Sequence, residues 1–205
     1  MSLFLLIRHG ETPHTGSRLS GRSPGVHLNE RGRQQAASLP ARLGPVAPQI
    51  LCSSPLERCC ETAQPLAEYF DLPLRRLDDL QELDYGHWQG SHFADLADDS
   101  YWHRYNRLRG TSRIPGGELL LEVQARMMRA LEALHREAPE GRIALCSHSD
   151  AIKALLLLLL GIPLDFVNRL ALAPASISAL SFGAGEPQLH CLNVTARLDE
   201  ALGMS

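Results

Sequence analysis

Short runs of apolar residues alternate along this chain with longer segments whose apolar positions have helical spacing. Residues 3–7 form the first run, five apolar residues that are too few for a typical helix and typical of a strand buried on both faces. Residues 49–52 and 142–147 repeat this pattern, and a predicted helix follows each of them. Strands that alternate with helices favour an α/β fold with a mainly parallel sheet.

The first helix is predicted over residues 30–43, after a polar loop. Asn29 is a favourable cap for its amino terminus. Ala36, Leu39 and Leu43 recur at the spacing of a buried helical face. The Gly-Pro pair that follows is expected to end the helix.

A second helix is expected just after the second apolar run. Ser54 and Glu57 fit a capping box, and Pro55 suits the first helical position. Arg58 would then lie one turn into this helix, near backbone N–H groups that favour anions. Its guanidinium suits a phosphate or a carboxylate. Taken alone, an ion pair with a glutamate on the same helix is the simpler interpretation.

The remaining elements follow from the same patterns. A turn at residues 115–118 begins a helix that is expected to run to about residue 137, and another helix is expected over residues 151–160. Residues 180–194 are predicted to form two more strands around a turn at residues 183–187.

The composition is that of an ordinary soluble protein. The 205 residues are 44% hydrophobic and 21% charged, with a net charge of −3, and we expect a single domain over residues 1–205. The chain lacks the excess of basic residues that is typical of nucleic-acid-binding proteins. Its apolar runs are all far shorter than the roughly 20 residues that span a membrane. Five cysteines without a C-x-x-C pair argue against a disulfide framework and favour a reduced, cytoplasmic protein.

Basic and imidazole side chains follow the predicted strands where each strand ends. Arg8 and His9 come after the first strand, Arg58 after the second and His148 after the third. In open α/β sheets this edge is where ligands bind, so we expect the four side chains to converge there. Glu82, from an acidic segment, could add a carboxyl. Such a set suits phosphoryl transfer through a phosphohistidine.

Two other segments could contact an anionic substrate. Residues 13–26 have the composition of an irregular loop, in which Ser20, Gly21 and Arg22 offer hydroxyl, backbone and guanidinium donors. Residues 101–113 contain four arginines among aromatic side chains. This basic stretch either covers the entry of the substrate or forms a solvated helix face, and the sequence leaves both interpretations open.

The blocks that carry these residues resemble the motifs of the histidine phosphatase superfamily, the phosphoglycerate mutase-like proteins. They follow family order and spacing over about residues 3–160, and five blocks together are highly specific. The blocks are Arg8-His9-Gly10-Glu11-Thr12, Ser53-Ser54-Pro55-Leu56-x-Arg58-x-x-x-Thr62-Ala63, Glu82-x-x-x-Gly86-x-Trp88-x-Gly90, Pro115-Gly116-Gly117-Glu118 and Ser147-His148. The resemblance implies a three-layer α/β/α sandwich around a mainly parallel central sheet.

The resemblance also implies a role for each residue of the catalytic set. His9 would be the nucleophile that becomes a phosphohistidine. Arg8, Arg58 and His148 would hold the phosphoryl oxygens and stabilise their charge. Glu82 would protonate the leaving oxygen and later take a proton from water. Neither a metal nor another cofactor is implied.

Further residues would contact the rest of the substrate. These are Thr15, Ser20, Gly21, Arg22 and Ser149. Thr15 stands where the family often has asparagine, and Ser149 follows the second histidine where glycine is common. Both departures bear on the identity of the substrate and leave the catalytic set intact.

The resulting hypothesis is a metal-independent phosphatase for a small phosphorylated metabolite. The alternative of a phosphoglycerate mutase is disfavoured because the segment from Ser91 to Ile114, which could form a lid, is short compared with the insert of the glycolytic mutases. A phosphoprotein phosphatase or a regulatory binding protein is a further alternative, and a serine hydrolase lacks the G-x-S-x-G elbow. We expect no nucleic-acid or membrane partner, and a homodimer stays an open expectation.

Overall fold

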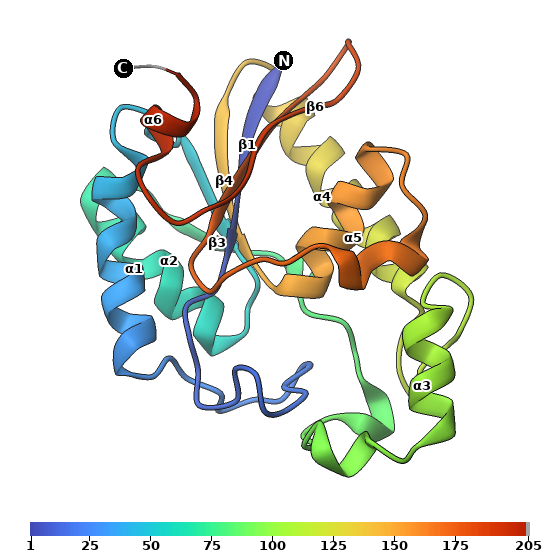
Figure 1. Ribbon diagram of the computed structural model, residues 1–205. Helices are drawn as coiled ribbons and strands as arrows, with labels where there is room; N and C mark the ends of the chain where they lie inside the picture. The colour runs from blue at the N-terminus through green and yellow to red at the C-terminus, as the bar shows by residue number, and fades with distance from the viewer. Residues whose placement is uncertain (204–205) are drawn as a thin grey trace.

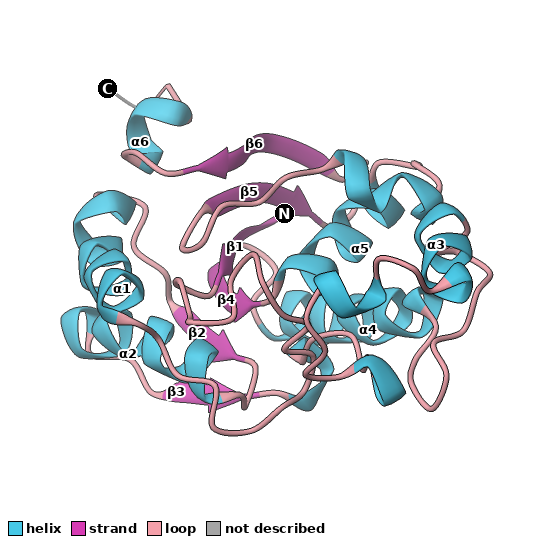
Figure 2. Ribbon diagram, turned by 60° about the horizontal axis from the view of Figure 1, so that its bottom comes forward, coloured by secondary structure: helices cyan, strands magenta, loops and turns pink. Residues whose placement is uncertain are grey.

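The computed structural model describes residues 1–203 and shows a six-stranded sheet between two layers of helices (Figure 1, Figure 2). The strands lie in the order β3-β2-β4-β1-β5-β6. β1 to β4 pair in parallel, whereas β5 pairs antiparallel with β1 and β6. The strands are β1 Ser2–Arg8, β2 Ile50–Ser53, β3 Leu74–Arg76, β4 Arg142–Ser147, β5 Ile177–Phe182 and β6 Gln188–Val194. The predicted fold class and mainly parallel sheet are confirmed.

Figure 2 shows α1, α2 and α6 on one face of the sheet and α4 and α5 on the other, with α3 beyond them. The helices are α1 Glu30–Leu43, α2 Glu57–Phe70, α3 Ser100–Arg107, α4 Leu120–Glu137, α5 Ser149–Leu159 and α6 Leu198–Ala201. Four 3₁₀ turns complete the described elements, namely η1 Asp78–Leu80, η2 Gly86–Trp88, η3 Ala94–Leu96 and η4 Leu164–Arg169. None of the helices in this part of the chain is long and apolar enough to cross a membrane.

The central strand β1 contributes to two hydrophobic cores. Phe4 and Leu6 pack on the face of α4 and α5, whereas Leu5 and Ile7 pack on the face of α1 and α2. All four side chains are almost fully buried. This alternation explains why the strand is an uninterrupted apolar run, because successive side chains enter opposite cores.

The parallel register brings three strand ends to one edge of the sheet. Arg8 at the end of β1 lies opposite Ser147 at the end of β4, and Ser53 at the end of β2 lies opposite Cys146. The segments that follow these strands therefore start side by side, as predicted for ligand binding at the carboxyl edge.

Helix α1 has the predicted bounds, and the side chain of Asn29 accepts the N–H of Gly32 at 2.8 Å as expected of a cap. Gly32 and Gly10 also permit a close approach of the chain. A Cβ on Gly10 would lie 2.7 Å from the Gly32 carbonyl oxygen, and one on Gly32 would lie 2.1 Å from the Glu11 carbonyl oxygen. The loop after β1 thus lies directly against the start of α1.

The predicted capping box of α2 is wrong. The helix begins at Glu57 with Leu56 as its cap residue, and no side chain caps it. The Ser54 hydroxyl is instead hydrogen-bonded to His148, and the Glu57 carboxylate accepts the N–H of Gly25 at 3.0 Å. Arg58 is consequently the second residue of the helix, closer to the strand end than predicted.

Residues 91–114, which we call the wall segment, contain η3 and α3 and lie beside the carboxyl edge of the sheet (Figure 1). Backbone hydrogen bonds tie the wall segment to the loop of residues 13–26, from Leu19 N–H to the Ser91 carbonyl and from Phe93 N–H to the Ser17 carbonyl, both 3.0 Å. Its other end is fastened where Gly110 N–H donates to Asp165 at 2.8 Å. Movement of this segment as a lid stays a prediction.

Candidate active site

Four of the five predicted catalytic residues converge on a cavity of about 340 Å³ at the carboxyl edge of the sheet. Arg8 and His9 reach it from the end of β1, Arg58 from the start of α2, and Glu82 from the loop after η1. The walls of the cavity are completed by Thr12, His14, Thr15, Gly16, Arg18, Leu19, Ser20, Gly21, Tyr85, Phe93, Trp102, Asn106, Arg109, Ser149, Asp150 and Asn168.

His9 is buried, with 7% of its surface exposed. Its Nδ1 lies 2.7 Å from the carbonyl oxygen of Gly10, and because a carbonyl only accepts, Nδ1 carries the proton. Nε2 is left with a free lone pair. Burial lowers the pKa of His9 well below its ordinary value, and the cations Arg58 and Arg8 lower it further. The ring of His9 is therefore neutral, with Nε2 able to act as a nucleophile.

Arg8 and Arg58 present donors to the same cavity. One nitrogen of each guanidinium binds a backbone carbonyl, that of Leu172 for Arg8 and that of Gly21, at 2.6 Å, for Arg58. Nε of Arg8 and both Nε and Nη1 of Arg58 are buried and have no acceptor among residues 1–203. A buried guanidinium N–H group without an acceptor destabilises the folded protein unless an anion binds it. This end of the cavity is therefore suited to an anion.

His148 lies behind His9, with the two ring centroids 5.2 Å apart. It is fully buried and does not line the cavity. Its Nε2 is 2.8 Å from the hydroxyl of Ser54 and 3.3 Å from the sulfur of Cys59. Burial, Arg58 and His9 hold the pKa of His148 well below its ordinary value, so the ring is neutral. Its contact with phosphoryl oxygens stays a prediction.

Glu82 is nine-tenths buried and faces the cavity. Its Oε1 accepts the N–H of Leu83 at 3.0 Å and that of Ala151, in the first turn of α5, at 3.2 Å. These bonds leave Oε2 as the oxygen for a proton. The pKa of Glu82 is raised, chiefly by burial and next by the charge of Asp150.

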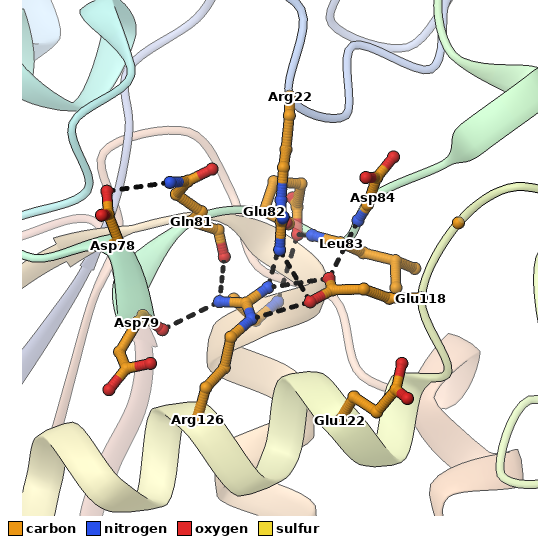
Figure 3. A network of polar contacts seen from close by, with 12 residues as sticks. Arg22, Asp78, Asp79, Gln81, Glu82, Leu83, Asp84, Glu118, Glu122 and Arg126 are labelled. Atoms are coloured by element: carbon orange, nitrogen blue, oxygen red, sulfur yellow. Dashed lines mark hydrogen bonds and ion pairs between the residues drawn. The ribbon is translucent and has the colours of Figure 1, made fainter.

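Two arginines hold the backbone of Glu82 in place (Figure 3). Arg126 of α4 donates to the carbonyls of Asp79, Gln81 and Glu82 at 2.6 to 3.0 Å. Arg22 donates from Nε to the same Glu82 carbonyl at 3.0 Å. The Glu118 carboxylate joins the two guanidiniums, 2.7 Å from Arg22 and 3.3 Å from Arg126. We call Arg22, Glu118 and Arg126 the Glu82 clamp.

The predicted substrate contacts divide into two groups. Thr15, Ser20, Gly21 and Ser149 line the cavity. Arg22 does not, because its guanidinium is engaged in the Glu82 clamp. The ion pair considered for Arg58 within α2 is not formed either, since its charged head lies inside the cavity wall. Contact of these residues with a substrate stays a prediction.

Both interpretations of residues 101–113 hold in part. Trp102 and Arg109 face the cavity, whereas Arg104 and Arg107 are exposed to solvent. Sequence reasoning missed several cavity residues, namely His14, Arg18, Tyr85, Phe93, Asp150 and Asn168. Asp150 carried a signal, as a charged residue two positions after the second histidine, whereas Asn168 lies in an otherwise featureless turn. No group of three or more metal-ligating side chains occurs among residues 1–203.

Comparison with known proteins identifies relatives over nearly the whole chain. The family model of the histidine phosphatase superfamily, branch 1, matches residues 4–195. A bifunctional protein of Mycobacterium tuberculosis is 38% identical over 202 residues, which are 95% of this chain and 54% of that protein. The chain thus spans about half the length of this relative. A probable phosphoglycerate mutase of Cronobacter sakazakii is 33% identical over 180 residues, covering 86% of this chain and 83% of the mutase.

Solved structures share the fold. A mycobacterial glucosyl-3-phosphoglycerate phosphatase superimposes with a TM-score of 0.84 at 30% identity, covering 94% of this chain and 98% of its own. A phosphoserine phosphatase of Entamoeba histolytica reaches 0.84 at 27% identity, covering 97% and 100%. The matched residues include every motif block on which the site is built. The chain belongs to branch 1 of the histidine phosphatase superfamily.

Proposed function

We propose that this protein hydrolyses phosphomonoesters of small metabolites through a phosphohistidine on Nε2 of His9. The observation that carries the proposal is that Arg8 and Arg58, which hold buried N–H donors without an acceptor among residues 1–203, line the cavity together with His9. These donors match the peripheral oxygens of a phosphoryl group, and the guanidinium fork suits them better than a single ammonium would.

In the first step Nε2 of His9 attacks phosphorus in line, and the P–N bond forms as the bond to the leaving oxygen breaks. Glu82 gives the proton on Oε2 to that oxygen, which leaves as an alcohol. Arg8 and Arg58 hold the charge that spreads over the phosphoryl oxygens in the transition state. The Nδ1–H bond to the Gly10 carbonyl keeps the ring oriented and supports the positive charge that it acquires.

In the second step water attacks the phosphohistidine. Glu82, now a carboxylate, takes a proton from the water while the new P–O bond forms and the P–N bond breaks. Phosphate leaves, His9 is again neutral, and Glu82 is again protonated. All atoms and charges balance without a metal ion.

The cavity favours a small substrate. Its volume is at the lower end for ligand pockets. The wall segment contributes Phe93, Trp102, Asn106 and Arg109 to one side, which leaves less room for a folded protein than an open shelf would. One similar phosphatase is named for glucosyl-3-phosphoglycerate and another for phosphoserine. Both compounds are small polar esters. A phosphoglycerate mutase is a second candidate, because one relative carries that name.

The test is phosphate release in the presence of EDTA from p-nitrophenyl phosphate, phosphoserine, phosphoglycerates and sugar phosphates. Wild type is expected to release phosphate, His9→Ala to release none, and His103→Ala, which replaces an exposed histidine of α3, to match wild type. Interconversion of 2- and 3-phosphoglycerate faster than phosphate release would favour the mutase. Equal activity of His9→Ala and wild type would contradict the proposal.

A further inference from the structure

A second carboxylate, Asp150, lies in the first turn of α5 and lines the same cavity as Glu82. It is 7% exposed and is fully engaged with buried partners. Its Oδ2 accepts the hydroxyl of Tyr85 at 2.6 Å and Nη1 of Arg109 at 2.7 Å, and its Oδ1 lies 3.2 Å from Nζ of Lys153. Nothing in the proposed two-step reaction uses this carboxylate.

Asp150 is ionised in this setting. Burial alone would raise its pKa, but Arg109 and Lys153, together with the Tyr85 hydroxyl, hold the pKa of Asp150 well below its usual range. A carboxylate that stays ionised cannot act as a proton donor to the substrate. Its fixed negative charge acts instead on its surroundings.

The nearest consequence falls on Glu82. The residue after Asp150 is Ala151, and its N–H donates to Oε1 of Glu82, so the Glu82 carboxyl lies against the helical turn that carries Asp150. Two carboxylates at one place repel each other when both are ionised, and one of them then keeps a proton. Because Asp150 is tied to two cations, Glu82 is the carboxyl of the two that binds a proton more readily.

One of the two cations that compensate Asp150, Arg109, comes from the wall segment. Arg109 has 5% of its surface exposed and also donates to Asn106 at 3.1 Å, while its guanidinium lies over the ring of Tyr105 at 4.8 Å. These contacts fix the guanidinium of Arg109. The wall segment therefore supplies a positive charge that pairs with Asp150 and also forms one side of the cavity.

Other charged and titratable groups surround Glu82 on every side. They are Arg8 from β1, Arg58 and Cys59 from α2, Arg22, Glu118 and Arg126 of the Glu82 clamp, Lys153 from α5, and Tyr85 and Tyr105. The cations favour an ionised Glu82, and Glu118 is itself paired with Arg22 and Arg126. Burial and Asp150 oppose the cations, so the protonation of Glu82 depends on Asp150.

We propose that Asp150 is a positioning residue whose fixed charge keeps the transferable proton on Glu82, and that Arg109 and Lys153 hold that charge in place. The inference rests on the proposed function, because it requires Glu82 to be the general acid. Under this proposal, Asp150 helps to determine the pH range in which the protein is active.

The variants are predicted to shift the pH profile in opposite directions. Asp150→Asn leaves Arg109 and Lys153 uncompensated, so Glu82 loses its proton more easily and the alkaline limb of kcat/KM moves down by about one pH unit. Lys153→Met removes a cation that favours an ionised Glu82, so the limb moves up. Arg109→Met is expected to move it in the same direction as Lys153→Met. A purely structural role would not produce opposite shifts.

The experiment measures kcat/KM against pH with an alkyl phosphate ester for wild type and these variants, after thermal unfolding has shown that each is folded. Asp98→Asn and Arg107→Met, which replace exposed charges of the wall segment, are the matched controls and are expected to keep the wild-type profile. Asp150→Glu, which keeps the charge, is expected to restore the limb toward its wild-type position. If Asp150→Asn does not fold, Asp150→Ser, which also removes the charge, carries the test.

Two failures can be told apart. A limb that disappears in Glu82→Gln but does not move in Asp150→Asn or Lys153→Met would overturn the role of Asp150 and leave the proposed function intact. An increase in KM for Asp150→Asn with an unmoved limb would assign Asp150 to substrate binding and also overturn it. A wild-type profile without any limb that depends on Glu82 would instead contradict the proposed acid.

Discussion

His9 and Glu82 are both buried beside the same cavity, and burial acts on the two side chains in opposite directions. It lowers the pKa of the imidazole, which is cationic when protonated, and raises the pKa of the carboxyl, which is anionic when ionised. Burial therefore favours the neutral form of both side chains. The proposed first step requires both neutral forms at once, with a free lone pair on His9 and a proton on Glu82.

Glu82→Gln is predicted to lower kcat/KM by an amount that depends on the leaving group of the substrate. With an alkyl phosphate, whose leaving oxygen needs a proton, kcat/KM should fall by about 10²- to 10⁴-fold. With p-nitrophenyl phosphate, whose phenolate leaves unprotonated, the loss of kcat/KM should be much smaller. Steady-state assays of both esters check this, and equal losses for the two would exclude Glu82 as the acid.

At the scale of elements, the site is assembled by parallel strand ends and secured from the helix layer. Strand register places His9 next to the start of α5, while Arg126 of α4 fixes the loop that carries Glu82 (Figure 3). Gly86 contributes as well, because a Cβ there would lie 2.3 Å from the Pro115 carbonyl oxygen. The Glu82 loop and the turn before α4 are thus packed backbone to backbone.

Arg126→Met is predicted to lower both stability and turnover. It removes the donor of three carbonyls and one partner of a buried ion pair, which should cost about 3 kcal/mol in the free energy of unfolding. A displaced Glu82 should lower kcat more than it changes KM. Urea unfolding and steady-state kinetics measure both effects.

Arg129→Met is the matched control, because it makes the same substitution at another arginine of α4. Arg129 pairs with Asp79 at 2.8 Å but its side chain is 64% exposed, so its removal should change the free energy of unfolding by less than about 1 kcal/mol. Similar losses for both variants would mean that the Glu82 clamp has no special role.

Local signals in the sequence predicted most elements, and contacts between distant residues account for the errors. The bounds of α1 follow from Asn29 and a periodic apolar face, both of which act within the helix itself. The capping box at Ser54 failed because His148, far along the chain, takes the hydroxyl. Arg22 does not line the cavity because the Glu82 clamp holds its guanidinium, and its contact with a substrate stays a prediction. No sequence spacing reveals which partner such a side chain will meet.

At the scale of the whole molecule, two buried histidines impose a dependence of stability on pH. His9 and His148 are buried as neutral rings, and their pKa values are well below the ordinary value of 6.5. As the pH falls below 6.5, the unfolded chain binds protons that the folded protein does not. The stability due to these two residues is therefore complete above that pH and is lost progressively below it.

His148→Asn is predicted to weaken this dependence. One fewer buried histidine removes up to one proton from the difference between the unfolded and folded states, which is a slope of about 1.4 kcal/mol per pH unit. Free energies of unfolding measured in urea between pH 7 and pH 5 should fall less steeply for the variant. An unchanged slope would show that His148 takes up a proton in the folded protein.

The measurement that tests the central claim most directly is the trapping of the phosphoenzyme. The protein is mixed with p-nitrophenyl phosphate, denatured at alkaline pH, and analysed by intact mass and by peptide mapping. We predict one added phosphoryl group on the peptide that contains His9 and none in His9→Ala. Glu82→Gln should accumulate more of it, because it lacks the base for the second step. A phosphoryl group on another residue, or release of phosphate by His9→Ala, would contradict the account.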